Sequence, residues 1–411
     1  MQSIVSRPTA FYGWRVVGAA FVLAVFGWGV GFYGPPVYLH AVRAARGWSL
    51  SLVSAAVTLH FLVGALVVAN LPALYRHFGL PSVTKAGALS LALGVCGWAW
   101  AEQPWQLFVA SFFSGVGWVA LGAAAVNAIV SPWFVRARPA ALGMAYNGAS
   151  IGGVVFSPLW VVAIEWLGFA HAAVLVGLVM VGSVWVLADR IFARTPQEMG
   201  LAPDGDAPGT PVPAVTSRAT RSLPGKLLWR DLRFITLAAG MAFGLFAQIG
   251  LIAHLFSLLI PALGTQGAGL AMGLATGSAI AGRTIVGWAM PVDADRRLVA
   301  SASYAVQIAG SIVLITAAGH SAPLLILGAV LFGAGIGNAT SLPPLIAQVE
   351  FAREDVQRVV AFIVAIGQGT YAFAPAAFGV IREFASAPAF FVAAALVQAA
   401  AICCFLAGRR R

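Results

Sequence analysis

Apolar runs of about 20 residues recur along the whole chain, and they limit its possible folds more than any other feature. A helical run of this length crosses the ~30 Å hydrocarbon core of a bilayer. Of the 411 residues, 60% are hydrophobic and 9% are charged, whereas a soluble chain carries about 25% charged residues. The short alternating segments of a β-barrel are not seen. The sequence therefore predicts an all-α protein that crosses the membrane many times.

We expect twelve spans, six on each side of a long polar segment at 189–232. Gly and Pro inside the runs do not oppose this, because neighbouring helices can satisfy the freed backbone groups. Residues 203–217 are rich in Pro, Gly, Ala and Thr and predict a flexible linker. The expected domains are bundles at 1–188 and 233–411, joined by a cytoplasmic linker at 189–232. The expected spans are 14–39, 50–71, 82–101, 105–130, 140–163, 169–188, 233–259, 267–290, 298–318, 322–347, 359–381 and 387–407.

The two halves resemble each other weakly in sequence. Gly115-Val116-Gly117 opens the fourth span and leads to Phe134, while Gly333-Ala334-Gly335 opens the tenth span and leads to Phe351. Two six-span halves related by a parallel pseudo-two-fold repeat are typical of a secondary transporter. Its substrate site is expected near the midplane, between the halves.

Basic residues are distributed unevenly between the two sides. With both termini on one side, that side holds 20 of the 24 Lys and Arg, while Arg43, Arg46 and Arg382 lie on the other. Cytoplasmic loops are enriched in Lys and Arg, so both termini are expected in the cytoplasm. The same rule explains the net charge of +11 without nucleic acid as a partner, because the charges do not cluster on one module.

Arg283, in the expected span 267–290, is the one formally charged residue inside an apolar run. A cation in hydrocarbon is costly unless it has a partner or a watery cavity, and no Asp or Glu lies inside the spans. An anionic substrate can supply the missing partner, because a guanidinium grips a carboxylate with two parallel hydrogen bonds. In the alternative, Arg283 extends to the cytoplasmic interface or pairs with Asp293.

Three further residues are candidates for carrying a proton. His254 in the seventh span and His60 in the second have rings that can bind substrate or a proton, but each is also typical of a buried histidine bonded to a carbonyl. Glu165 lies at the outer end of the fifth span. The loop carboxylates Asp295 and Asp355 are interpreted as solvated charges.

Uncharged polar side chains inside the spans complete the candidate site. Each can contact substrate or hydrogen-bond to a neighbouring helix. Considered alone, each is more typical of a hydrogen bond between helices than of a substrate contact. No metal-ligand spacing, disulfide pattern or catalytic constellation is seen, so neither a cofactor nor an enzymatic activity is expected. The candidates of this kind are Asn127, Asn147, Asn338, Gln368, Tyr33 and Tyr371.

Several motifs resemble those of the major facilitator superfamily, and within it the bacterial monocarboxylate and oxalate–formate transporter branch. Residues Trp133–Gly143 are similar to the signature WF-x-x-x-R-x-x-A-x-G. His254-Leu255 lies in the seventh span and Gly282-Arg283 in the eighth. The likeness extends over the whole chain. The remaining motifs are Phe11–Trp14, Gly47–Ser49 and Arg194–Gly205.

The resemblance implies a proton-linked or exchange transporter of small organic anions in which Arg283 binds the substrate carboxylate. The chain departs from the pattern at two charged positions. Human-type monocarboxylate carriers have an aspartate four residues before this arginine, where Ala279 stands here. Oxalate carriers have a lysine in the eleventh span, where Gln368 and Tyr371 are the sizeable polar groups. These departures leave the coupling ion open and favour a substrate with one negative charge.

A third departure concerns gating. The loop motif G-x-x-x-D-R-x-G appears as Pro72–Gly79, with Arg76 in place of the aspartate. The residues expected in gating loops are Arg76, Arg136, Arg138 and Asp293.

We therefore expect a monomeric transporter in a bacterial cytoplasmic (inner) membrane. It would carry a small organic anion, by proton symport or by anion exchange, as the two halves rock around a central site. One alternative is an exporter or importer of apolar or aromatic compounds, because the spans carry few polar groups. An alternative of another class is a membrane receptor or assembly factor that transports nothing.

Overall fold

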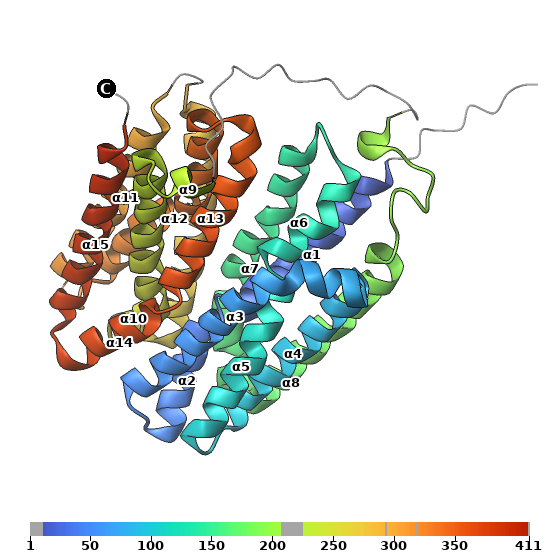
Figure 1. Ribbon diagram of the computed structural model, residues 1–411. Coiled ribbons are helices and arrows are strands. Elements are labelled where there is room, and N and C mark those ends of the chain that lie inside the picture. Colours follow the sequence, from blue (N-terminus) through green and yellow to red (C-terminus); the bar gives the residue numbers. More distant parts are fainter. Residues whose placement is uncertain (1–10, 207–224, 292–293, 318, 410–411) are drawn as a thin grey trace, which may run out of the picture.

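The computed structural model describes residues 11–206, 225–291, 294–317 and 319–409, and the regular elements in these ranges are helices (Figure 1). Eleven helical stretches in the described residues are long and apolar enough to cross a membrane. The prediction of an all-α protein with many membrane-crossing helices is confirmed.

The helices of the first half follow the expected spans but are broken at turns. A left-handed Gly47 (φ 67°) ends α2, a conformation that glycine adopts without steric cost. The side chain of Ser49 then accepts the Leu52 N–H at 3.3 Å and so caps the next helix. The helices are α1 (Tyr12–Gly31), α2 (Pro35–Arg46), α3 (Leu50–Phe78), α4 (Leu80–Trp100), α5 (Pro104–Ala120), α6 (Ala123–Val130), α7 (Arg138–Leu167) and α8 (Phe169–Leu187).

The second half contains a helical stretch much longer than a bilayer requires. Helix α10 (Leu232–Ala289) has 58 residues, and its two parts together contain roughly 87 Å of helix. It contains Pro261 and is interrupted at Gly264, whose backbone is not helical (φ 68°, ψ 173°). The expected spans 233–259 and 267–290 lie on either side of this interruption. The other helices are α9 (Gly225–Leu228), α11 (Arg296–Thr316), α12 (Ala322–Glu350), α13 (Arg353–Tyr371), α14 (Ala374–Phe384) and α15 (Ala387–Ala407).

Two groups of helices lie side by side in Figure 1, α1–α8 in blue to green and α9–α15 in yellow-green to red. The start of α1 and the end of α15 lie at the same end of the molecule, here called the terminal end. The hairpin between α2 and α3 and the end of α14 lie at the opposite end, here called the far end. The side on which a residue lies is described below by these two names.

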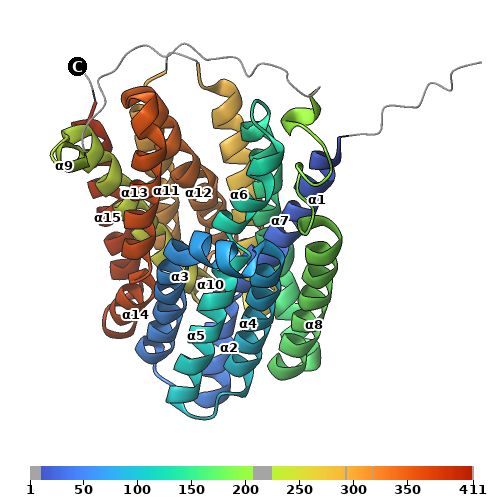
Figure 2. The same cartoon turned by 45° about the vertical axis from the view of Figure 1, so that its right-hand side comes forward.

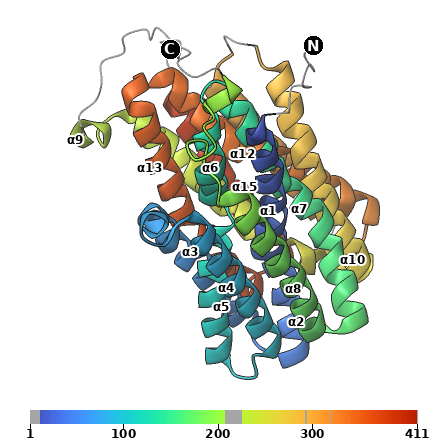
Figure 3. The same cartoon turned by 90° about the vertical axis from the view of Figure 1, so that its right-hand side faces the viewer.

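Small residues bring the two groups into close contact. A Cβ atom at Gly273 of α10 would lie 3.1 Å from the Val154 carbonyl oxygen of α7, and one at Gly379 of α14 would lie 2.5 Å from the Ser54 hydroxyl of α3. Figure 3 shows α7 beside α10, and Figure 2 shows α14 beside α3. Close backbone approach of this kind is how membrane helices gain packing energy. The two groups therefore meet along α7–α10 and α3–α14.

Three of the sequence motifs meet at the terminal end of the first group. Phe11 packs edge-on against Phe134 at a centroid distance of 5.6 Å. The Asp204 carboxylate accepts the backbone N–H groups of Arg136 and Ala137 at 2.8 and 3.1 Å. The Asp206 carboxylate pairs with the Arg136 guanidinium at 2.5 and 2.7 Å. Residues 204–206 of the expected linker are thus fixed onto the loop that begins α7.

Candidate functional site

Arg283 lies on the second part of α10, 19 residues after the interruption at Gly264, and is partly exposed. Its Nε donates to the carbonyl oxygen of Gly337 on α12 at 3.2 Å. Among the described residues, no carboxylate forms an ion pair with it. The two terminal guanidinium nitrogens, which donate no hydrogen bond to the described part of the chain, remain available to an anion.

Glycines set the position of this arginine by bringing α10 against α12. A Cβ atom at Gly282 would collide with the Ala334 carbonyl, and one at Gly337 would lie 3.0 Å from the Arg283 Cβ. Ala279, one turn before Arg283, packs into the same interface and is buried. The short spacing between the helices therefore fixes the base of the Arg283 side chain and one of its donors.

Tyr33 and Thr276 adjoin Arg283 and bring the two helix groups together there. Tyr33, at the junction of α1 and α2, is 7% exposed, and its hydroxyl interacts with the Thr276 side chain and with the charge of Arg283. Both side chains lie over Gly153 of α7, where a Cβ atom would be 2.5 Å from Thr276 Cγ2 and 2.6 Å from Tyr33 Cε2. We call Arg283, Tyr33 and Thr276 the Arg283 site.

Thr276 was not among the expected site residues, although the sequence contains a signal for it. It precedes Arg283 by seven residues, close to two helical turns, so the two residues share a face of α10. The Arg283 site combines a fixed cation with two hydroxyl groups. This combination suits an anion that also accepts a neutral hydrogen bond.

The structure places His60 inside the first helix group. It is 1% exposed, its Nδ1 pairs with the Ser114 hydroxyl, and its Nε2 pairs with the Gly31 carbonyl, both at 2.8 Å. Its ring stacks on Trp118 at 6.3 Å. Both ring nitrogens are thus occupied by bonds that join α1, α3 and α5.

His254 is fully buried in the second helix group and lies apart from Arg283. Its Nε2 pairs with the Pro375 carbonyl at 3.0 Å, and its ring meets Phe390 edge-on at 5.8 Å. The chain turns back at Gly264, because Arg233 at the start of α10 bonds to Arg297, which follows its end. His254 lies ten residues before this turn and Arg283 lies 19 residues after it. Their positions along the helix axis therefore differ by about 13 Å.

Glu165 joins the two helix groups at the far end. Its carboxylate accepts the Thr265 hydroxyl, and it accepts the Gln266 amide at 3.0 Å. Both donors follow directly after the interruption at Gly264. The structure therefore places Glu165 where α7 meets the start of the second part of α10, outside the Arg283 site.

The remaining polar candidates are dispersed over several helices. Tyr371 meets Phe61 of the other group edge-on at 5.9 Å. Asn338 is buried one residue after the Gly337 carbonyl that binds Arg283. Asn127 accepts the Ser131 hydroxyl at 2.6 Å. Asn147 is exposed on α7, and the partly exposed Gln368 makes no side-chain hydrogen bond to the described residues.

The expected gating residues fall into three situations. Arg76 is exposed near the end of α3 and has no ion pair among the described residues. Arg136 is held by Asp206, as described above, and Arg138 donates to the Phe134 carbonyl at 2.9 Å. Asp293 lies outside the described residues.

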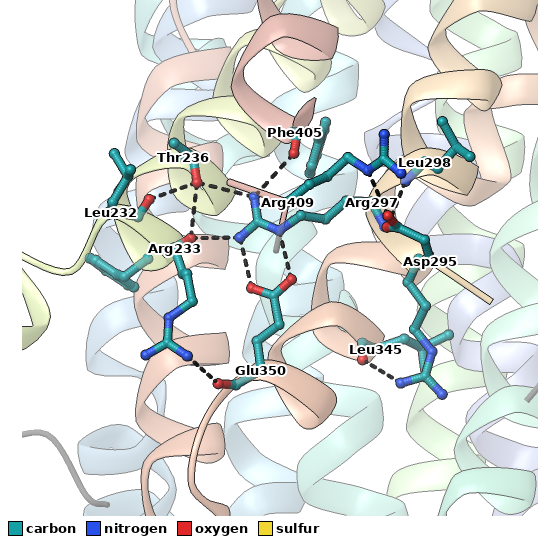
Figure 4. A network of polar contacts seen from close by, with 12 residues as sticks. Leu232, Arg233, Thr236, Asp295, Arg297, Leu298, Leu345, Glu350, Phe405 and Arg409 are labelled. Carbon is teal, nitrogen blue, oxygen red and sulfur yellow. Dashed lines mark hydrogen bonds and ion pairs between the residues drawn. The ribbon is translucent and has the colours of Figure 1, made fainter. Parts of the chain in front are cut away.

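Figure 4 shows a second arginine within the helices that sequence reasoning missed. Arg297 of α11 is 1% exposed and forms a two-point ion pair with Glu350 of α12, at 2.7 and 2.8 Å. It also donates to the Thr236 hydroxyl at 3.0 Å and to the Arg233 carbonyl at 2.8 Å. Helices α10, α11 and α12 are thus joined at the terminal end. A pocket beside this network is lined by Ala294, Asp295, Arg296, Arg297, Ile346, Val349, Glu350 and Arg409.

The interpretation of the loop carboxylates as solvated charges is wrong for Asp355, whereas Asp295 is exposed as expected but also has partners. Asp295 caps α11 by accepting the Arg297 N–H at 3.0 Å, and it pairs with Arg409 at 2.6 Å. The Asp355 side chain is 6% exposed and pairs with Arg358 at 2.7 Å. Partners on neighbouring turns and helices, which composition does not reveal, hold both carboxylates in place, and the Asp355 side chain is also removed from water.

The chain matches a family model over most of its length and one relative over part of it. A sequence model of the Major Facilitator Superfamily matches residues 18–349. Monocarboxylate transporter 11 of Homo sapiens is 26% identical over 179 residues, which is 42% of this chain and 36% of that protein. The match thus spans little more than a third of the relative.

Two solved structures share the fold. The nucleoside transporter NupG superposes with a TM-score of 0.74 at 11% identity, over 96% of this chain and 100% of that one. A bacterial homologue of the human lysosomal transporter Spinster, inward-facing and unoccupied, superposes with a TM-score of 0.68 at 14% identity, over 98% of both chains. At these identities the likeness concerns the fold alone.

Proposed function

The chain belongs to the Major Facilitator Superfamily, and from this premise we propose that it is a secondary active transporter of small organic anions, chiefly monocarboxylates. The observation that carries the proposal is Arg283, a partly buried cation that has a carbonyl partner at 3.2 Å and no carboxylate partner among the described residues. A substrate carboxylate would complete its hydrogen bonds and neutralise its charge.

We propose that the two helix groups are the moving units of the transport cycle. The interruption at Gly264 divides α10 into two pieces that are each long enough to cross a bilayer, which supports twelve passes in two six-helix bundles at 1–188 and 233–411. The Arg283 site takes Tyr33 from one group and Arg283 from the other. A substrate bound there would therefore contact both units, as alternating access requires.

The substrate class rests on the number of charges in the site. Arg283 is the one cation of the Arg283 site, which favours a single negative charge. The partial likeness to a human monocarboxylate transporter supports the same class. The Tyr33 hydroxyl would donate to a second oxygen of the anion, such as the keto oxygen of pyruvate. The Thr276 hydroxyl donates to the Met272 carbonyl at 3.0 Å and could only accept a hydrogen bond, for example from the hydroxyl of lactate.

We further propose that the protein exchanges anions rather than carrying protons with them. His60, His254 and Glu165 each bond to other groups of the protein, and none of the three contacts the Arg283 site. Exchange needs no proton carrier. The membrane proposed is a bacterial inner membrane, with the terminal end on the cytoplasmic side and the monomer as the working unit.

Uptake into proteoliposomes tests the proposed substrate class. Purified protein would be reconstituted and offered labelled lactate, pyruvate, formate and oxalate, with Arg283→Gln and Arg46→Gln in parallel. Arg46 is exposed and makes no side-chain hydrogen bond to the described residues, so its variant controls for the loss of a positive charge. We expect uptake of monocarboxylates by wild type and Arg46→Gln, and a loss of about 10- to 100-fold for Arg283→Gln, since bonds to charged groups contribute about 1.5–3 kcal/mol.

The coupling proposal has its own measurement in the same vesicles. Unlabelled substrate inside the vesicles should accelerate uptake of label, and an inward acid gradient should leave the rate unchanged. Acceleration by external acid, with no effect of internal substrate, would establish proton symport and reject exchange.

A further inference from the structure

Basic side chains meet at the far end of the molecule, where α2 of the first group approaches α10 and α14 of the second. Arg43 of α2 and Arg382 of α14 lie within electrostatic range of each other, and His40, one turn before Arg43, lies within range of both. We call Arg43, Arg382 and His40 the far-end basic cluster. Arg43 and Arg382 are two of the three basic residues that the charge pattern assigns to this side.

The cluster has no acidic partner in the described part of the chain. Arg43 makes no hydrogen bond or ion pair there, and its Nε is buried without an acceptor. Arg382 donates to the Ser257 hydroxyl and, at 3.5 Å, to the His254 carbonyl, both of which are neutral. The neighbouring carboxylate of Glu383 accepts the Ser51 N–H at 2.7 Å instead.

The walls of this region position Arg382 and the helix that carries Arg43. The His40 ring meets Phe256 edge-on at 5.6 Å, which joins α2 to α10 next to Ser257. Ser257 is 8% exposed and fixes one end of the Arg382 guanidinium. Two like charges are thus brought together from different helix groups, an arrangement that repulsion and desolvation both oppose.

We propose that the far-end basic cluster binds a small anion, held between Arg43 and Arg382 while the two helix groups are in contact at this end. The anion accepts hydrogen bonds from the Arg43 guanidinium, which has no acceptor among the described residues, and from Arg382, and its negative charge offsets the repulsion. Because one arginine comes from each group, the anion stabilises the closed arrangement of the far end and leaves when the groups separate.

This binding site is separate from the Arg283 site. The Arg382 guanidinium contacts the His254 backbone, and His254 lies about 13 Å from Arg283 along the helices. A small anion cannot touch both arginines at once. The proposal therefore holds or fails independently of what Arg283 binds.

Anion-dependent thermal stability tests the proposal on the purified full-length protein in detergent. The unfolding midpoint would be followed while chloride, phosphate, acetate or lactate replaces a bulky organic sulfonate at constant ionic strength. The variants are Arg283→Gln and, in that background so that anion binding at the Arg283 site does not contribute, Arg43→Gln with its neighbour Arg46→Gln as the matched control. Arg43 makes no hydrogen bond to the described chain, so its replacement removes a charge and no protein hydrogen bond.

We expect a saturable rise in the midpoint for wild type, Arg46→Gln and Arg283→Gln, and a half-saturating concentration at least tenfold higher for Arg43→Gln. Lower half-saturation by acetate and lactate identifies organic carboxylates as the ligand, and lower half-saturation by chloride or phosphate identifies inorganic anions. Equal responses of Arg43→Gln and Arg46→Gln overturn the proposal, as does the absence of saturation in wild type. Loss of the response in Arg283→Gln also overturns it, because the anion then acts at the Arg283 site.

Discussion

At the scale of single residues, the contrast between Arg283 and Arg297 is informative. Both lie on helices that pack against α12. Arg297 forms a two-point ion pair with Glu350. Arg283 donates a hydrogen bond to a carbonyl and forms no ion pair with a carboxylate among the described residues. The protein therefore pairs one helix arginine within its own structure and leaves the other with free donors, as expected if the two serve structure and substrate respectively.

The structural role of Arg297 gives a prediction for stability. Arg297→Leu should lower the free energy of unfolding by about 3–5 kcal/mol, because Glu350 is left with an uncompensated and largely buried charge. Arg296→Gln is the matched control, since the Arg296 side chain makes one hydrogen bond to the described residues, to the Leu345 carbonyl at 3.1 Å. Denaturant unfolding in detergent measures both variants. If Arg297→Leu proves no less stable than Arg296→Gln, the ion pair does not hold α11 to α12.

Arg283 could be identified from the sequence because a charge within an apolar run is a local feature. The partners of Arg297 and Asp295 are not local: Glu350 and Arg409 lie far along the chain, and packing of helices alone brings them near. For the same reason, Tyr33 was one of many polar candidates in the sequence, and only its contact with Thr276 and Arg283 singles it out.

At the scale of helices, span positions could be predicted but helix breaks could not. Length and apolar composition locate a membrane-crossing run directly. The expected span 14–39 is broken into α1 and α2 just before Pro35, and the expected span 105–130 is broken at Gly122. A hydropathy average is taken over about 19 residues, so it does not resolve a break of a few residues within an apolar run. The expected span 50–71 continues as helix to Phe78, because polar residues beyond the apolar run also favour the helix.

The loop between α6 and α7 depends on one carboxylate. Asp204 accepts three backbone N–H groups of this loop, from Val135, Arg136 and Ala137. Desolvation raises the pKa of Asp204, but these donors and the charge of Arg136 outweigh it and hold the pKa below its ordinary value. The ionised form is therefore the one that stabilises the folded loop.

Asp204→Asn should destabilise the protein at neutral pH by about 1–3 kcal/mol, the contribution of hydrogen bonds to a charged group. Because the folded-state pKa is depressed, this stabilisation is present above the ordinary carboxyl value of about 3.9 and is lost as the pH falls through the folded-state pKa. Thermal unfolding from pH 7 to pH 3 should show the difference from wild type shrinking in acid.

The control for this change is Asp189→Asn. Asp189 pairs with Lys85 at 2.7 Å but its side chain is 51% exposed, so its removal should cost about 1 kcal/mol or less. Equal destabilisation by the two variants, or a difference that does not depend on pH, would contradict the role given to Asp204.

At the scale of the whole molecule, the two helix groups meet at points that differ in chemistry. Small residues along α7–α10 and α3–α14 allow close packing, Glu165 forms hydrogen bonds, and the far-end basic cluster places cations near each other. Interfaces of this mixed kind can separate and re-form more readily than a continuous apolar core. The proposed rocking of the groups around the Arg283 site uses these same surfaces.

The central claim is that Arg283 holds the transported anion, and its most direct measurement is uptake of labelled lactate and pyruvate by three forms of the protein reconstituted at equal density. The forms are wild type, Arg283→Lys, which keeps the charge but not the planar pair of donors, and Arg283→Gln. The account predicts a rate that falls from wild type to Arg283→Lys and falls further, to about 10- to 100-fold below wild type, for Arg283→Gln. Uptake by Arg283→Gln at the wild-type rate would contradict it.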